Sequence, residues 1–413
     1  MTAPEVVAAH RAAVGADPDL DRCPIMGTYA PPTVEFVRGE GSWLWDRDGR
    51  RYLDLLSGLA VTSLGHAHPE VADALAEQSR TLLHVSNLFA TEHAPVVAST
   101  LDRLLGGGGQ VFFANSGAEA VECALKLARK WGPAPSGRYQ VVSAWGSFHG
   151  RTLAALAATG QPAKHEPFQP LPEGFRHVPF DDLDALDAAV TPDVAGVLLE
   201  AVQGEGGVQP AGTEYLRGVR EICTERGVLM MVDEVQTGLG RCGAWFAHQR
   251  AGIRPDVVTM AKALGNGVPI GACWATAEAA AAFAPGDHAT TYGGQPLATA
   301  AARAVLEVME REDVPERANR AGARFADALL GTAHVDSVRG HGLLLAVELT
   351  VPSAEVAAEL FAAGVVVNAV TPTALRLAPS LLISDAEVDA GVAAIVDAAA
   401  AVAGRTGGSE GPA

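Results

Sequence analysis

The chain has 413 residues, 48% of them apolar, and a formal net charge of −18. A chain of this length can bury a sizeable core and form two domains, or one large domain with a smaller appendage. The negative charge excludes nucleic acid and anionic membranes as expected partners, because both bind to basic surfaces. No window approaches about 20 uninterrupted apolar residues, so we expect no membrane-spanning helix.

The cysteines indicate a reducing compartment. All five are scattered and none forms a CxxC pair, which favours free thiols over a disulfide framework or a zinc site. The N-terminus has no basic segment followed by an apolar one, so we expect no signal peptide and a cytoplasmic protein. His66 and His68 lack further ligands at a suitable spacing, and we interpret them as turn residues and expect no metal.

In chain order, the first part of the sequence predicts a small antiparallel meander. A short helical pattern and a proline-rich turn at 31–32 precede residues 34–56, where two glycine-containing turns separate three strand-like runs. A Gly–His turn at 65–66 then leads into a helix predicted over roughly 69–83.

From about residue 90 the pattern alternates between helices and short apolar strands. Such strands are typical of a sheet that is buried on both faces, so we expect a mostly parallel α/β domain. Its strands are predicted at 111–114, 141–144, 194–200, 228–234, 257–260 and 269–275. The chain after Tyr292 mixes strands with helices near 295–311, 315–330, 353–363 and 385–403, which predicts a second, smaller α+β domain.

Lys262 is one of only four lysines in the chain. It ends the apolar run VVTM and is followed closely by Gly265, Asn266 and Gly267. A partly desolvated amine loses its charge readily, and a neutral lysine is a nucleophile toward an aldehyde. Taken alone, the pattern favours a surface lysine at a strand end, so a catalytic interpretation depends on residues elsewhere in the chain.

Two other strands end in residues suited to a charged ligand. The first runs into Ser116, Gly117 and Ala118 at the start of a helix, where small residues and the helix dipole favour a phosphate; an ordinary helix cap is the alternative. The second ends at Asp233, where open α/β sheets place ligands. A carboxylate in so apolar a setting needs a cationic partner, which a protonated pyridine nitrogen would supply; a cap of the next helix is the alternative.

The segment WGSFHGRT (145–152) adds an aromatic and a cation. Phe148 could stack on a flat ring and Arg151 could bind a carboxylate through two bonds, although a core-packed aromatic and a solvated arginine would look the same. A lysine, an aspartate, a phosphate-ready helix start and a stacking aromatic are together what pyridoxal 5′-phosphate (PLP) requires.

These residues lie in motifs that resemble those of the class-III (ω-amino acid) aminotransferases of PLP fold type I, closest to the acetylornithine branch. The resemblance runs from about Tyr29 to Leu381. The motifs occur in the family's order: NSGAEA, FHGRT, ExVQGEGG, DEVQTGLGR, TMAKALGNGVPIGA, TTYGG and LRLAPS.

The resemblance implies an α/β fold with a large domain, whose mostly parallel seven-stranded sheet is flanked by helices, and a smaller α+β domain built from both chain ends. We expect residues 1–65 and 296–404 to form the smaller domain and residues 66–295 to form the PLP-binding domain. The remaining residues, 405–413, would be a disordered tail.

For the cofactor, the resemblance implies one role for each of four residues. Lys262 would hold PLP covalently and later move a proton. Asp233 would pair with the pyridine nitrogen, Gln236 would bond the phenolic oxygen, and Phe148 would stack on the ring.

The phosphate site would have two parts. Ser116, Gly117 and Ala118 would cradle the phosphate, and Thr291 would complete the site of the neighbouring subunit. This arrangement implies a homodimer with shared active sites.

For the substrates, the resemblance implies two arginines and a switch. Arg151 would bind the carboxylate at the far end of an ω-amine, and Arg376 would bind the α-carboxylate of glutamate or 2-oxoglutarate. Glu205 would neutralise Arg376 when an ω-amine is bound. One pocket must accept both a dicarboxylate and an amine, so its arginine must be maskable.

Other pocket residues bear on the donor. Leu59 stands where ornithine δ-aminotransferases carry a tyrosine, which is compatible with an N-acylated substrate, while Ser86, Asn87 and Tyr29 are further candidates. The sequence departs from the family's motifs in two places: Ala201 replaces a proline and Gln295 replaces an asparagine.

We therefore expect transfer of the δ-amino group of N-acetylornithine to 2-oxoglutarate, giving N-acetylglutamate 5-semialdehyde and glutamate, in arginine biosynthesis. The alternatives are other donors (ornithine, succinylornithine, 4-aminobutyrate, or another diamine or ω-amino acid) and, less favoured, a PLP-dependent aminomutase. Arg151 and Arg376 together favour exchange with a keto acid over an aminomutase. Lys262, Asp233 and Gln236 together disfavour a non-catalytic protein on the same scaffold.

Overall fold

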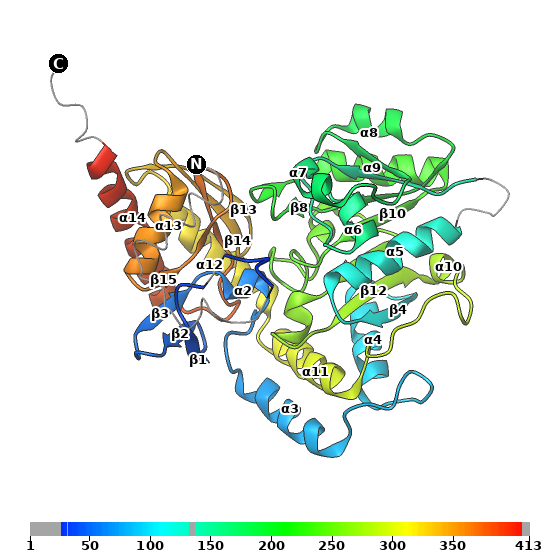
Figure 1. Cartoon of the computed structure of the whole chain (residues 1–413), viewed down its shortest axis with the longest axis horizontal. Helices are drawn as coiled ribbons and strands as arrows, with labels where there is room; N and C mark the ends of the chain where they lie inside the picture. The colour runs from blue at the N-terminus through cyan, green and yellow to red at the C-terminus, as the bar shows by residue number, and fades with distance from the viewer. Residues whose placement is uncertain (1–25, 31, 132–136, 407–413) are drawn as a thin grey trace.

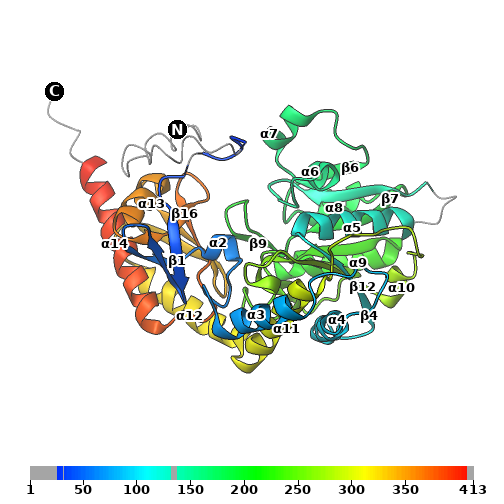
Figure 2. The same ribbon diagram turned by 60° about the horizontal axis from the view of Figure 1, so that its bottom comes forward.

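The computed structural model describes residues 26–30, 32–131 and 137–406. The helical pattern expected in the first residues lies outside the described residues, and so does Cys23. The expected turn at 31–32 and the expected tail at 405–413 lie partly outside them. Figures 1 and 2 show two parts side by side, with α3 (Pro69–Thr81) and α11 (Pro296–Arg311) beneath their junction.

The larger part is built on a seven-stranded sheet of order β4-β12-β11-β10-β7-β5-β6. Within this sheet, β12 runs antiparallel to both of its neighbours and the other strands run parallel. Every residue of β7, β10 and β11 is buried, which is why these strands read as continuous apolar runs. The predicted mostly parallel sheet is confirmed. The strands are β4 (Gly109–Ala114), β5 (Gln140–Ala144), β6 (Phe175–Val178), β7 (Val194–Leu199), β10 (Leu229–Asp233), β11 (Val257–Met260) and β12 (Gly271–Thr276).

Helices connect and flank these strands: α4 (His93–Leu104), α5 (Gly117–Trp131), α6 (Leu153–Ala158), α7 (Pro162–His165), α8 (Leu183–Ala189), α9 (Thr213–Arg226) and α10 (Ala277–Ala280). The departure at Gln295 has a local explanation. The Gln295 side chain accepts a hydrogen bond from the backbone of Leu297 at 2.8 Å and so caps α11.

The smaller part contains two sheets and three longer helices. In one sheet, β15 (Val365–Val366) pairs in parallel with β3 (Arg51–Asp54), so segments from both chain ends share a sheet with β1 (Phe36–Glu40) and β2 (Trp43–Asp46). The other has the order β13 (Val335–His341), β14 (Leu344–Leu349), β17 (Ala374–Leu377), β16 (Asn368–Ala369). The helices are α12 (Val314–Leu329), α13 (Ser353–Ala362) and α14 (Asp385–Thr406). A smaller α+β part is thus confirmed, while the exact domain limits stay predictions.

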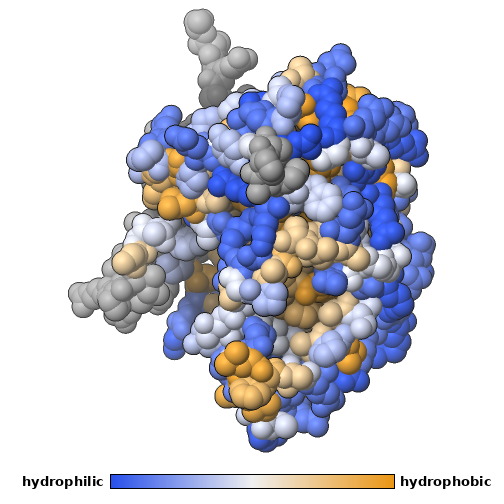
Figure 3. Space-filling view, turned by 90° about the vertical axis from the view of Figure 1, so that its right-hand side faces the viewer, coloured by the Kyte–Doolittle hydropathy of each residue, from blue (hydrophilic) through white to orange (hydrophobic). Residues whose placement is uncertain are grey.

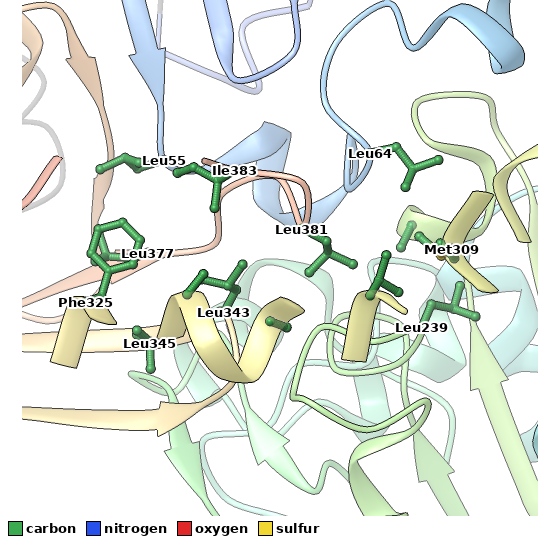
Figure 4. Close-up of a cluster of buried hydrophobic side chains, with 14 of the residues drawn as sticks. Leu55, Leu64, Leu239, Met309, Phe325, Leu343, Leu345, Leu377, Leu381 and Ile383 are labelled. Carbon is green, nitrogen blue, oxygen red and sulfur yellow. The ribbon is translucent and has the colours of Figure 1, made fainter. Parts of the chain in front are cut away.

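One apolar cluster joins the two parts. It runs from Leu55 and Phe325 in the smaller part to Leu239, in the loop after β10, and Met309 on α11, and Figure 4 shows these side chains distributed between the ribbons of the two parts. Because interiors are close-packed, such a core holds residues of the small part in fixed positions relative to the large sheet.

Some elements were not predicted from the sequence, and one is longer than predicted. Strand β6 has the sequence FRHV, whose two polar residues break the apolar run that marks its neighbours. The hairpin of β8 (Val202–Gln203) and β9 (Gln209–Pro210) is too short to give a periodic signal. Helix α14 ends at Thr406, so it extends into the segment that was expected to be a tail.

Trp274 tests the packing of the central sheet. It is fully buried on β12, its indole N–H donates to Asp102 at 2.9 Å, and a Cβ on Gly109 would lie 2.3 Å from its ring. We expect Trp274→Ala to lower the free energy of unfolding by about 3–5 kcal/mol, as measured by urea denaturation. The half-exposed Leu330, replaced by Ala as the control, should change it by less than about 0.5 kcal/mol. Equal effects of the two substitutions would contradict this packing.

Candidate active site

A cavity of about 400 Å³ opens at the carboxyl edge of the large sheet. The loops that follow β4, β5, β7, β10 and β11 meet there because these five strands point the same way, and ligands of open α/β sheets bind at this edge. Each of these loops contributes side chains to the cavity, among them Ser116, Phe148, Glu200, Asp233, Gln236 and Lys262.

Lys262 lies directly beyond β11 in a strained conformation. Its φ is +43°, and it begins the short 3-10 helix η4 (Lys262–Gly265). Left-handed backbone at a lysine is costly and persists where the surroundings enforce it, often at functional sites. Burial lowers the pKa of the Lys262 amine; Glu205 opposes this change and Arg376 reinforces it. The amine is therefore easier to deprotonate than a solvated one.

Asp233 ends β10 with its carboxylate held by two bonds. One oxygen contacts Nδ1 of His149 at 2.8 Å, and the other accepts the backbone N–H of Val235 at 3.0 Å. Both side chains are buried, and Nε2 of His149 has no hydrogen-bond partner among the described residues. The carboxylate is thus fixed in orientation at the cavity wall.

The start of α5 is capped, as the alternative interpretation expected. The backbone N–H of Glu119 donates to Ser116 Oγ at 3.2 Å, and the Glu119 carboxylate accepts the backbone N–H of Asn115 at 2.7 Å. Capping does not exhaust the N-terminus, because several N–H groups of a first helical turn lack an intrahelical acceptor. The helix start lines the cavity and can still bind an anion.

Close packing explains the small residues at this turn. A Cβ on Gly117 would lie 2.8 Å from the Val235 side chain, and one on Gly271 would lie 2.2 Å from the carbonyl oxygen of Ser116. Neither position has room for a side chain. The turn is thereby held against both the Asp233 loop and the start of β12.

Arg376 extends from β17 of the smaller part toward the same cavity. Its side chain is 1% exposed, and its Nη1 contacts Glu205 Oε1 at 2.5 Å and Gln236 Oε1 at 3.4 Å. Burial would raise the pKa of the Glu205 carboxyl, but Arg376, Lys262 and Lys164 outweigh burial and lower it. Glu205 is therefore ionised and neutralises a buried guanidinium.

Phe148 and Arg151 lie together on the loop after β5. The Arg151 guanidinium is 5.7 Å from the Phe148 ring centroid, and the Lys164 amine lies at the same distance from that ring. Arg151 is exposed, so its guanidinium is available to a ligand at the mouth of the cavity. This cationic mouth suits an anionic substrate group.

Three predicted site residues lie elsewhere. Ser86, Asn87 and Thr291 line a second cavity of about 450 Å³, which does not include Lys262. Asn87 Nδ2 donates to the carbonyls of Thr290 and Gly293 at 3.1 and 3.2 Å, which joins the two segments that form this cavity. Within one subunit, these residues are not brought together with the lysine.

Tyr29 and Leu59 line neither of these cavities. Tyr29 is 87% exposed, and Leu59 is exposed with a left-handed φ of 69°. Their proposed contact with substrate stays a prediction.

Sequence reasoning assigned no role to His149 or Glu200. Glu200 follows β7 and is buried; its carboxylate accepts the backbone N–H of Phe148 at 3.1 Å and of Gly204 at 3.3 Å. Burial raises the pKa of Glu200 to about 7, with Asp233 acting in the same direction and His149 against it. The sequence contained a signal for Glu200, because the apolar run VAGVLLE (194–200) ends in this acid just as the apolar strand β10 ends in Asp233.

A metal centre and a membrane span have no counterpart in the part of the chain that the structure describes. No group of three His, Cys, Asp or Glu side chains there could hold a metal ion, and none of the described helices is long and apolar enough to cross a bilayer. His66, which could have suggested a metal, instead contacts Asp54 at 2.7 Å.

Comparison with known proteins identifies the family. Residues 27–399 match the family described as aminotransferase class-III. The chain belongs to the class-III aminotransferases.

Relatives of this class-III aminotransferase are similar to it in sequence over about 90% of the chain. The acetylornithine aminotransferase of Corynebacterium efficiens is 50% identical over 382 residues, which are 90% of this chain and 94% of that protein. That of Mycolicibacterium smegmatis is 48% identical over 375 residues, 90% of this chain and 95% of that protein.

Solved structures show the same fold. The ornithine aminotransferase of Toxoplasma gondii matches with a TM-score of 0.89 at 32% identity, covering 97% of this chain and 99% of that one. The N-acetylornithine aminotransferase of Stenotrophomonas maltophilia matches with a TM-score of 0.79 at 35% identity, covering 91% and 98%.

The cofactor of this aminotransferase is PLP, and the cavity fits it. A protonated pyridine nitrogen would give the buried Asp233 carboxylate a cationic partner. Ser116, Gly117 and Ala118 line the cavity, so the start of α5 faces the space that a phosphate would occupy. Lys262 supplies an amine of lowered pKa for covalent attachment.

Glu200 generates a pH-dependent prediction. Its folded-state pKa of about 7 exceeds the ordinary value of 4.5, so its contribution to stability is fully present below pH 4.5 and is lost as the pH rises through 7. Glu200→Gln removes this titration. We expect the stability of Glu200→Gln relative to the wild type to rise by about 1 kcal/mol between pH 6 and pH 8.5. Urea denaturation of the PLP-free protein measures it, and a pH-independent difference would contradict it.

Proposed function

We propose that the protein transfers the δ-amino group of N-acetylornithine to 2-oxoglutarate, giving N-acetylglutamate 5-semialdehyde and glutamate. The observation that carries this proposal is the buried Arg376–Glu205 ion pair beside Lys262. Relatives about 50% identical that are named acetylornithine aminotransferases support the choice of donor.

The residues that face PLP have distinct tasks in this proposal. When bound, PLP supplies an electron sink for the carbon that loses a proton. Asp233 keeps the pyridine nitrogen protonated, and its bond to His149 fixes the direction of the carboxylate. Gln236 bonds the phenolic oxygen and Phe148 stacks on the ring. Lys262 binds the cofactor, and its Nζ, once released, moves the substrate proton.

The Arg376–Glu205 pair explains how one cavity accepts two kinds of substrate. A buried guanidinium left without an anion beside it would be strongly destabilised. When 2-oxoglutarate or glutamate is bound, its α-carboxylate replaces Glu205 as the partner of Arg376. When an ω-amine is bound, Glu205 remains and no positive charge faces the donor's carbon chain.

Arg151 is the residue that binds the end of the donor farthest from the reacting amine. It stands at the cavity mouth, where it binds the distal carboxylate of the donor. The apolar Leu59 offers no hydrogen-bond partner to a free α-amine, which favours an N-acylated donor over ornithine.

The second cavity supports a homodimer. Ser86, Asn87 and Thr291 need a partner subunit if they are to serve a PLP site, because they line a separate cavity in their own subunit. Figure 3 shows apolar atoms gathered in a hollow on the side that carries α4, β4 and α10. The segments around this cavity expose large apolar side chains, namely Leu82, Leu83, Leu88, Phe89, Val96 and Tyr292. A second copy would cover them and bring the partner subunit's Thr291 to the phosphate.

We also place the reaction in arginine biosynthesis and in the cytoplasm. The named donor supports the first. The free buried thiols of Cys123, Cys223, Cys242 and Cys273 support the second. The division into a PLP-binding domain (66–295) and a smaller domain from both chain ends is part of the same proposal.

Single-turnover kinetics of the PLP form tests the choice of donor. N-acetylornithine, ornithine, succinylornithine and 4-aminobutyrate are each mixed with the enzyme, and the change in cofactor absorbance gives kcat/KM. We expect N-acetylornithine to exceed ornithine and 4-aminobutyrate by at least about tenfold. Comparable kcat/KM values for all four donors would contradict the assignment of N-acetylornithine as the specific donor.

The dimer is tested by placing a charge on its proposed interface. Leu88 is 85% exposed in the single chain, and Leu88→Asp would bury an unpaired carboxylate between subunits. We expect a shift from dimer to monomer in sedimentation at micromolar concentration, with a loss of PLP retention. Leu330→Asp, a half-exposed site on the smaller part, is the matched control and should remain dimeric. A dimeric Leu88→Asp would place the interface elsewhere.

A further inference from the structure

The segment that carries Glu205 is short and tightly packed. Residues 204–207, which we call the switch segment, lie in the turn between β8 and β9. Under the proposed function, Glu205 must leave Arg376 and return to it once in each catalytic cycle. Whether the whole segment moves or only the side chain depends on what holds its two ends.

The first end is held by Glu200. One oxygen of this buried carboxylate accepts the backbone N–H of Gly204 at 3.3 Å, and the other accepts that of Phe148 at 3.1 Å. One carboxylate therefore fixes the switch segment relative to the loop that carries the ring-stacking aromatic. A Cβ on Gly204 would lie 2.1 Å from Gln236 Oε1, so the backbone is also confined by packing.

The second end is held by Arg339 on β13 of the smaller part. Its Nε and Nη2 donate to the carbonyl oxygen of Gly207 at 3.1 and 2.7 Å, while its Nη1 contacts Glu348 at 2.5 Å. Gly207 has a φ of +100°, and a Cβ there would lie 2.8 Å from the Thr371 side chain. The planar guanidinium, itself anchored by Glu348, thus fixes this carbonyl.

Between these two anchors, Glu205 is the only residue of the switch segment that has a side chain. The Glu205 side chain is 33% exposed, and its carboxylate contacts Arg376. We propose that Glu200 and Arg339 are positioning residues that fix the two ends of the switch segment, so that Glu205 leaves and re-forms its contact with Arg376 by side-chain rotation alone. Neither residue touches the reacting atoms; each acts through Glu205.

This proposal rests on the proposed function, and it predicts an unequal effect on the two substrates. If an anchor is lost, Glu205 masks Arg376 less often, because the loosened backbone has other conformations to occupy. The ω-amine needs the mask, whereas glutamate needs Arg376 free. Loss of an anchor should therefore slow N-acetylornithine more than glutamate.

The test measures kcat/KM for glutamate divided by that for N-acetylornithine on the PLP form of the holoenzyme. This ratio cancels any loss of folded or cofactor-loaded protein, and it also cancels changes at Phe148 that affect both substrates equally. We expect the ratio to rise about tenfold in Glu205→Gln and at least about threefold in both Glu200→Gln and Arg339→Lys. In the Glu205→Gln background, neither anchor substitution should change the ratio further.

A binding measurement gives a second readout that does not involve turnover. Glutarate, a five-carbon dicarboxylate without a keto group, must displace Glu205 to reach Arg376. Its Kd, measured by calorimetry on the holoenzyme, should fall in Glu205→Gln and fall by a smaller factor in each anchor variant. A residue with a merely structural role would weaken glutarate binding or leave it unchanged.

Matched controls separate positioning from general damage. Glu234→Gln removes another buried carboxylate that accepts backbone N–H groups, those of Ala247 and His248, away from the switch segment. Arg324→Lys alters another arginine of the smaller part, one that forms two bonds to Asp389. Both should leave the ratio within about twofold of the wild type.

The outcomes distinguish the two levels of the proposal. If Glu205→Gln leaves the ratio unchanged, the switch itself is wrong and the positioning roles fall with it. If Glu205→Gln raises the ratio but Glu200→Gln and Arg339→Lys do not, only the positioning roles are overturned. Should Glu200→Gln fail to fold, Arg339→Lys alone decides between these results.

Discussion

The active site depends on a buried guanidinium that must always have an anion beside it. Arg376 is almost fully enclosed, and Glu205 is the carboxylate that meets it. Removing either partner of a buried ion pair is far more costly than breaking an exposed pair. The cavity can therefore accept a dicarboxylate only by exchanging one anion for another, and this exchange lets a single site serve two unlike substrates.

The residues that take part in this exchange come from both parts of the molecule. Glu205, Asp233 and Lys262 come from loops at the carboxyl edge of the large sheet, whereas Arg376 comes from a strand of the smaller part. The shared apolar core fixes the position of the two parts relative to each other. Arg339 of the smaller part adds a hydrogen bond to the switch segment. Close packing around the buried charges holds them in fixed positions.

The sequence was most informative where a local pattern determines the structure. Continuous apolar runs identified the buried strands β7, β10 and β11, because parallel strands covered on both faces need no polar alternation. Strand β6 was missed because its polar residues interrupt such a run. The ends of the expected helices were nearly right, since proline at the start of α3 and α11 is a local signal.

The residues of the candidate site also divide into those that a local pattern indicated and those that it did not. Lys262 and Asp233 stand out as polar residues beside apolar strands, and the resemblance to a family placed Arg376 and Glu205. Glu200 was overlooked because its role lies in two backbone N–H groups, one of them 52 residues away in sequence. The separation of Thr291 from Lys262 within one subunit was implied only by the resemblance, because no local pattern shows how distant loops fold.

A crystal structure of the holoenzyme with glutarate bound would test the exchange of anions most directly. We expect one glutarate carboxylate on Arg376, the Glu205 side chain turned away, and the backbone of residues 204–207 unmoved. Glutarate bound elsewhere while Glu205 still contacts Arg376 would contradict the exchange. A displaced switch segment would contradict its fixed ends.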